Sequence, residues 1–274
     1  MQNYVTKLKP GVLVMTATIA PSPLMSNTER RDPALRIADY TDALKFYLNI
    51  NNQHIDRIIF AENNGSDLAP LQELTESKSH GKRVEFISFI SDCDPALGKG
   101  YSELHMLDKA VSESTLLAEQ DMLWKVTGRL RIRNIERMIE TAPKEYVFYC
   151  DLRNLPVAIL RLGGTSAIWA GYRFMETRIF SCSVKAYNRY IMGQYKKIKT
   201  MQHPCGNSNI IENHLFEVLI EALRNDAGII PRFRIQPQVE GTAGFSNQDY
   251  VNFAYRFKLN GRRAFRTLLP WLWV

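Results

Sequence analysis

A short basic corner near the middle of the chain carries residue types suited to phosphate chemistry. Thr127, Gly128 and Arg129 follow an apolar, strand-like run and precede a helical pattern for which Asn134 is a good N-cap. A glycine lets a ligand approach the backbone closely. An arginine presents a fixed fork of donors that matches phosphate oxygens. We therefore hypothesise that this corner binds the phosphates of a nucleotide-activated sugar, the alternative being a turn with a solvated arginine.

The elements around this corner predict where it lies in the fold. Apolar, β-branched runs alternate with helical patterns, giving expected strands at residues 12–19, 55–61, 83–90, 122–126 and 146–150 and helices at 32–49, 68–77, 102–117 and 135–141. This alternation is typical of an α/β protein with a mainly parallel central sheet flanked by helices. Such sheets bind ligands outside the carboxyl ends of their strands, where the corner would lie.

The pattern becomes less regular after residue 154. We expect a loop or irregular hairpin at 160–168, strands at 178–184 and 233–239, and helices at 186–192 and 210–224. One domain is predicted over residues 1–250, with its halves at 1–154 and 155–250, followed by a basic aromatic segment at 251–274.

Composition narrows the class of protein. The chain has 274 residues with 45% hydrophobic and 23% charged side chains, which is ordinary for a soluble globular protein. No apolar run is long enough to span a membrane, and the N-terminus lacks the apolar core of a secretory signal. The four cysteines show no C-x-x-C spacing and are interpreted as reduced thiols of a cytoplasmic protein.

The excess of basic residues indicates an anionic partner. The net charge is +7, which leaves nucleic acid, a membrane surface and phosphorylated substrates open. Residues 255–274 interleave aromatic and apolar side chains with basic ones, a combination that suits contact with the surface of an anionic membrane. The alternative is a C-terminal helix packed on the domain. We expect a cytoplasmic protein that is peripheral on the inner face of the cytoplasmic membrane.

Three motifs carry a resemblance to a known family. They are Gly98-Lys99-Gly100-Tyr101 before a helix, the corner from Lys125 to Arg129, and Glu212-Asn213-His214 in a later helix. With the order of elements over residues 12–223, the chain resembles a GT-A type glycosyltransferase of bacterial surface polysaccharide synthesis, as in lipopolysaccharide or capsule.

The resemblance implies a GT-A-like, Rossmann-like fold and the transfer of a sugar from a nucleotide-sugar donor to a glycan or lipid-linked glycan acceptor. Residues 1–154 would bind the donor and 155–250 the acceptor. The donor-binding residues it implies are Thr16, Thr18, Ala20, Pro21, Glu62, Asn63, Lys99, Tyr101, Lys125, Thr127, Gly128 and Arg129.

One departure from the family pattern concerns the metal. The family's Asp-x-Asp motif holds a divalent cation on the diphosphate, but the matching positions, Thr127 to Arg129, carry no carboxylate. We predict metal-independent transfer, in which Arg129 with Lys99 or Lys125 supplies the positive charge. A competing placement of the motif at Asp151-Leu152-Arg153 keeps Mg²⁺ or Mn²⁺ open.

The resemblance also points to residues for proton transfer. An inverting transferase needs a base near the acceptor hydroxyl, and Glu212 is the first choice, with His214 and Glu217 as alternates. The alternative is that Glu212 is a first-turn acid stabilised by the helix dipole. Asp151 and Arg153 are candidates for acceptor contact, although an aspartate at a strand end can also cap the next segment.

Three rival functions are weighed against this one. A nucleic-acid-binding protein fits the charge, but no recognised binding signature is present. A dinucleotide-dependent oxidoreductase lacks G-x-G-x-x-G after the first strand. A catalytically inactive GT-A-like interaction module is kept open by the missing Asp-x-Asp.

Overall fold

The computed structural model describes residues 10–25, 28–155, 172–198, 210–244, 250, 260–262, 264 and 266–268. In the first half, the elements are β1 (Gly11–Ala17), α1 (Pro33–Leu48), β2 (Ile55–Glu62), α2 (Ala69–Lys78), β3 (Arg83–Ser88), the 3₁₀ turn η1 (Pro95–Leu97), α3 (Lys99–Glu113), β4 (Met122–Thr127), β5 (Arg131–Ile132), α4 (Ile135–Thr141) and β6 (Phe148–Tyr149). They are followed by β7 (Leu152–Leu155), β8 (Tyr172–Met175), β9 (Ile179–Ser183), α5 (Val184–Tyr190), η3 (Gln194–Lys197), α6 (Ile210–Leu223), β10 (Ile229–Ile230) and β11 (Val239–Glu240).

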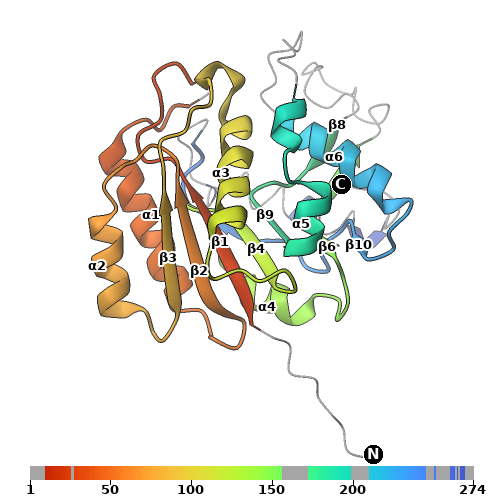
Figure 1. Cartoon of the computed structure of the whole chain (residues 1–274). Helices are drawn as coiled ribbons and strands as arrows, with labels where there is room; N and C mark the ends of the chain where they lie inside the picture. The colour runs from red at the N-terminus through yellow and green to blue at the C-terminus, as the bar shows by residue number, and fades with distance from the viewer. Residues whose placement is uncertain are drawn as a thin grey trace, which may run out of the picture.

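A seven-stranded sheet runs through the molecule in the order β10-β6-β9-β4-β1-β2-β3 (Figure 1). Neighbouring strands are parallel except at β9, which is antiparallel to both β4 and β6. Because β9 runs the other way, its first residues lie at the edge where β4 ends. Two small two-stranded sheets, β7 with β8 and β5 with β11, flank this sheet.

The two faces of the sheet bury two separate hydrophobic cores. Along β1, Leu13 and Met15 face the core that contains α1, α2 and α4, whereas Val12 and Val14 face the core that contains α3, α5 and α6. All of β1 is buried, which explains its continuous apolar sequence. The result is a three-layer arrangement with helices on both faces of the sheet (Figure 1). The expected α/β fold with a mainly parallel sheet is therefore confirmed.

Most of the expected elements are present with shifted ends. The Asp32 carboxylate caps α1 by accepting from the amides of Ala34 and Leu35. Helix α3 begins at Lys99 and ends at Glu113, earlier than the predicted 102–117. The strand predicted at 233–239 is wrong, because only Val239 and Glu240 pair, in β11. The hairpin of β7 with β8 was not predicted.

The structure also corrects the capping role of Asn134. This residue precedes α4, but its side chain makes no capping hydrogen bond. Its amide donates to the carbonyl of Gln236 at 2.8 Å and accepts from the amide of Gln238 at 2.8 Å. These bonds satisfy backbone groups of 236–238 from the side, so this segment needs no strand partner there.

Two sequence-based expectations fall largely outside the described residues. The loop or hairpin at 160–168 lies outside them entirely, and so does most of the basic aromatic segment at 251–274. The described part of that segment is helical at residues 260–262, 264 and 266–268. Among the described residues, no helix has both the length and the apolar character needed to cross a bilayer.

Candidate functional site

A buried carboxylate holds the loop that follows β1 in place. Glu62, the last residue of β2, is fully buried and accepts from the amide of Ile19 at 3.1 Å. Its other oxygen accepts from the amides of Asn64 at 2.9 Å and Ser66 at 3.1 Å. One side chain therefore joins the loops after β1 and β2. Glu62 was predicted as a donor-binding residue, and the structure shows it shaping the loops.

Helix α1 holds the same loop from a second side. Arg36 is buried and donates from Nε to the carbonyl of Thr18 at 2.6 Å. The Tyr40 hydroxyl accepts from the Thr18 amide at 2.9 Å. The sequence interpretation did not single out these residues. Their signal was an arginine on the otherwise apolar face of a helix, four residues before a tyrosine.

A pocket opens between these loops at the carboxyl ends of β1 and β2. It is lined by Thr18, Ser22, Met25, Asn63, Asn64, Ile90, Ser91, Cys93, Asp94, Pro95 and Ser102. Asn63 spans it, accepting from the Thr18 hydroxyl at 2.8 Å and donating to the Ser102 hydroxyl at 2.7 Å. The structure thus brings Thr18 and Asn63 together, and both are residues for which donor binding was predicted. In the same loop, Ala20 is exposed and Pro21 is buried.

Gly128 is placed by the backbone of the neighbouring strand. Its amide donates to the carbonyl of Thr16 at 2.9 Å, and a Cβ at this position would lie 2.7 Å from that oxygen. Contact with β1 alone therefore requires a glycine, whatever ligand the corner binds. The sequence interpretation assigned this glycine to close approach of a ligand, whereas the close approach that the structure shows is that of a strand of the same sheet.

A carboxylate from α3 accepts hydrogen bonds from side chains of both β1 and β4. Glu103 Oε1 accepts from Thr16 Oγ1 at 2.9 Å, from Lys125 Nζ at 2.6 Å and from Thr127 Oγ1 at 3.2 Å. Burial opposes its ionisation, but Lys125 lowers the pKa of Glu103 below its ordinary value. Lys125 is itself buried and also donates to the carbonyl of Thr177 at 2.6 Å. Glu103 therefore neutralises Lys125, and the sequence interpretation missed it.

Two further cations lie at this edge. Burial lowers the pKa of Lys99 in the first turn of α3, an effect that Glu212 opposes and Arg129 reinforces. Arg129 donates from Nε to the carbonyl of Thr242 at 3.2 Å. The charge of Lys99 therefore interacts with those of Glu212 and Arg129, although the three residues come from separate parts of the chain.

Glu212 carries a desolvated carboxyl group, and one of its oxygens accepts no hydrogen bond among the described residues. It lies in the first turn of α6, and its Oε2 is shielded from solvent without a hydrogen-bond partner among the described residues. Its Oε1 is 3.5 Å from the Thr177 hydroxyl. Burial raises the pKa of Glu212 from 4.5 to about 7, and the nearby Glu103 adds to the effect. Such a carboxyl can exchange a proton near neutral pH.

A tight contact between two helices sets the position of Glu212. A Cβ on Gly100, in the first turn of α3, would lie 2.3 Å from Cγ2 of Ile211 in the first turn of α6. The helix starts therefore meet side by side, which places Lys99 and Glu212 in one region.

Other predicted site residues face elsewhere. His214 lies within 3.0 Å of Gln194 Oε1, and burial lowers its pKa. Glu217 is exposed and accepts from Arg173 at 2.9 Å. The Tyr101 ring packs edge-on against Tyr195 at 5.0 Å between centroids. Neither alternate base candidate shares the surroundings of Glu212.

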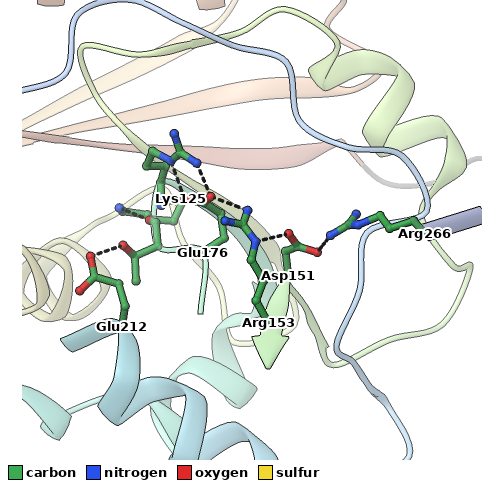
Figure 2. Close-up of polar contacts among 8 residues, drawn as sticks. Lys125, Asp151, Arg153, Glu176, Glu212 and Arg266 are labelled. Atoms are coloured by element: carbon green, nitrogen blue, oxygen red, sulfur yellow. Dashed lines mark hydrogen bonds and ion pairs between the residues drawn. The ribbon is translucent and has the colours of Figure 1, made fainter. Parts of the chain in front are cut away.

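Asp151 and Arg153 belong to a buried ion-pair chain. Asp151 is fully buried between Arg153, whose Nε donates to it at 3.1 Å, and Arg266, which donates to its other oxygen. Arg153 also donates to Glu176 at 2.8 Å, and Arg178 pairs with Glu176 in turn. Figure 2 shows this chain, with Asp151 between the two arginines. Burial opposes ionisation of Glu176, but Arg178 and Arg153 hold its pKa well below the ordinary range.

One group of described residues has the chemistry of a metal site. Ligand atoms of Asp92, Cys93 and His105 lie within 4.8 Å of one another, close to the pocket. Cys93 Sγ is 2.9 Å from His105 Nδ1, which a thiol-to-imidazole hydrogen bond explains. The carboxyl edge at Thr127 to Arg129 offers no comparable group among the described residues.

Comparisons with known proteins give distant likenesses only. No protein-family model matches the chain, and no curated protein matches its sequence. Among solved structures, HddC from Yersinia pseudotuberculosis is 13% identical, with 92% of this chain and 99% of that one covered and a TM-score of 0.38. The galactosyltransferase LgtC, with donor and acceptor sugar analogues, is 11% identical, with 80% and 72% covered and a TM-score of 0.41. A 4-diphosphocytidyl-2C-methyl-D-erythritol synthase is 12% identical, with 91% and 97% covered and a TM-score of 0.41. These scores establish neither a family nor an activity.

Proposed function

We propose that the protein is a glycosyltransferase that moves a sugar from a nucleotide-activated donor to a hydroxyl group of a glycan or lipid-linked glycan, in the synthesis of a bacterial surface polysaccharide. The observation that carries the proposal is Glu212, a desolvated carboxyl with a free oxygen and a pKa of about 7. It lies beside Lys99 at the carboxyl edge of a mainly parallel sheet, where such sheets bind ligands.

Glu212 would act as the base in the transfer step. The acceptor oxygen forms a bond to the anomeric carbon of the donor while the bond from that carbon to the diphosphate oxygen breaks. The hydroxyl proton passes to the Glu212 carboxylate, and the diphosphate leaves with the electron pair. Deprotonated Glu212 is available at neutral pH because its pKa lies close to 7.

The donor would be held in two places. Its base would bind in the pocket lined by Thr18, Asn63 and Ser102, whose amide and hydroxyl groups offer donors and acceptors. Its diphosphate would lie against Lys99 and Arg129, which supply positive charge to the leaving group. Because residues 127–129 carry no carboxylate, the proposal is metal-independent transfer. Residues 251–274 would hold the enzyme against the inner face of the cytoplasmic membrane, a proposal supported by sequence alone.

Thermal melting of the whole chain against UDP, GDP, CMP and their sugars, with either EDTA or Mn²⁺, tests this proposal. A ligand that binds only the folded state must raise the melting temperature. We expect one nucleotide class to raise it in the presence of EDTA. A shift that requires Mn²⁺ would refute metal independence, and no shift with any nucleotide would refute the transferase. Binding without turnover would indicate an inactive module.

A further inference from the structure

The ion-pair chain around Asp151 and Glu176 carries more positive than negative charge. Four arginines act on these two acids: Arg153 from β7, Arg178 from the segment before β9, and Arg262 and Arg266 from the C-terminal helical residues. We call this group the arginine cluster. Among the described residues, these are four guanidinium groups against two carboxylates, an excess of two positive charges.

Outside the described residues, the sequence from 156 onward has one acidic side chain, Asp249, and several basic ones. A fifth arginine, Arg232, is close enough to feel these charges: burial and the charge of Arg266 lower its pKa, and Asp151 opposes this.

Arg262 shows the imbalance most directly. It is partly buried and has no hydrogen-bond partner among the described residues. Burial, with the charge of Arg153, lowers the pKa of Arg262 to about 10. Placing a further cation beside two arginines that are already paired costs free energy, which an anion bound there would offset.

We propose that the arginine cluster binds a phosphate group of the acceptor. This inference rests on the proposed transferase and specifies its acceptor as a phosphorylated glycan. Phosphate suits the cluster because its oxygens match the arginine fork and its charge of up to −2 equals the excess. A phosphate monoester of a soluble sugar and a phosphate that joins a glycan to a lipid would offer the same group.

The position of the cluster favours the acceptor over the donor. Glu176 is followed by Thr177, whose hydroxyl is 3.5 Å from Glu212 Oε1. Lys99, in the first turn of α3, interacts with Glu212 and with Arg129, which follows β4. Two sets of basic side chains therefore lie near Glu212. Lys99 and Arg129 would contact the donor, and the arginine cluster would contact the acceptor.

Titration of the whole chain with inorganic phosphate tests the site by calorimetry at constant ionic strength. We expect saturable binding that Arg262→Gln weakens by about tenfold or more, because a bond to a charged group is lost. The matched control is Arg224→Gln, an exposed arginine paired with Glu221, which should leave phosphate affinity unchanged. Without phosphate, Arg262→Gln should melt at or above the wild-type temperature, because it relieves repulsion.

Two further measurements separate the alternatives. A hexose 1-phosphate and phosphatidylcholine vesicles that contain a polyprenyl phosphate distinguish a soluble phosphate from a lipid-borne one. Unsaturable phosphate binding, or equal affinity in wild type and Arg262→Gln, would overturn the site. Loss of nucleotide binding in Arg262→Gln would assign the cluster to the donor and overturn the acceptor assignment. If the wild type binds a nucleotide but no phosphate, only the acceptor-phosphate inference is refuted. If it binds phosphate but no nucleotide, the proposed transferase activity is refuted.

Discussion

Replacing Glu212 by glutamine should stabilise the protein while it removes activity. The pKa of this carboxyl is raised from 4.5 to about 7 in the folded protein because burial disfavours its charged form. Glutamine has nearly the same shape and never ionises. The variant therefore avoids the cost of a buried charge and loses the base.

The stability gain should depend on pH in a defined way. Below pH 4.5 the carboxyl is protonated in both states, so the variant should have no electrostatic advantage. As the pH rises from 4.5 to about 7, the unfolded chain loses its proton while the folded protein keeps it. Wild-type stability then falls by about 1.4 kcal/mol per pH unit. Above pH 7 the advantage of the variant should level off at about 3 kcal/mol, because the pKa of this carboxyl is 4.5 in the unfolded chain and about 7 in the folded protein.

Urea denaturation at several values between about pH 5 and pH 8 measures this difference. The control is Glu221→Gln in the same helix, an exposed acid whose replacement should give no comparable pH dependence. Turnover of the wild type should rise with pH through about 7, and Glu212→Gln should lose about 10²- to 10⁴-fold. Parallel stability profiles of wild type and Glu212→Gln would show that the carboxyl is solvated and would refute the reasoning.

Three further substitutions test how the site is built. Gly128→Ala places a Cβ against the Thr16 carbonyl, so we expect a loss of about 1–3 kcal/mol in the free energy of unfolding, measured in urea. Glu62→Gln replaces one acceptor oxygen with a donor beside backbone amides; we expect a loss of about 1–3 kcal/mol and weaker nucleotide binding by calorimetry. Lys125→Met leaves the Glu103 carboxylate without its buried partner and should cost about 3–5 kcal/mol, of which Glu103→Gln in the same chain should restore a part.

Each of these has a control in the same chain. Gly261→Ala introduces a Cβ into open space and should leave stability equal or slightly raised; a similar loss at both glycines would contradict the packing argument. Glu76→Gln changes an exposed acid of α2, and an effect as large as that of Glu62→Gln would show that the loop bonds are unimportant. If the Lys125 and Glu103 substitutions are strictly additive, the pair is not coupled.

The regular half of the fold could be predicted because its signals are local. The continuous apolar run of β1 and the Asp32 cap of α1 each depend on neighbouring residues only. The irregular half could not, because its structure depends on distant partners. Segment 236–238 looked like a strand by composition, yet the side chain of Asn134 satisfies its backbone groups.

The candidate site shows the same division. The family resemblance pointed to Glu212 as a candidate base from its place at the start of a helix, and the structure puts it beside Lys99. It could not find Glu103, because an acid in the first turns of a helix is ordinary until Lys125 is seen to point at it. The ion pairs of Asp151 likewise depend on Arg266, which lies 115 residues further along the chain.

The pocket and the proposed base are separated along the chain in a way that bears on biosynthesis. Every residue lining the pocket lies between Thr18 and Ser102, and β1 to β4 are complete by Thr127. Glu212 and its helix follow much later. During synthesis from the N-terminus, all residues that line the pocket therefore leave the ribosome before the proposed base does. If the pocket binds a nucleotide as proposed, a nucleotide that bound at that stage would favour folding of the first half before the growing polypeptide contains the proposed base.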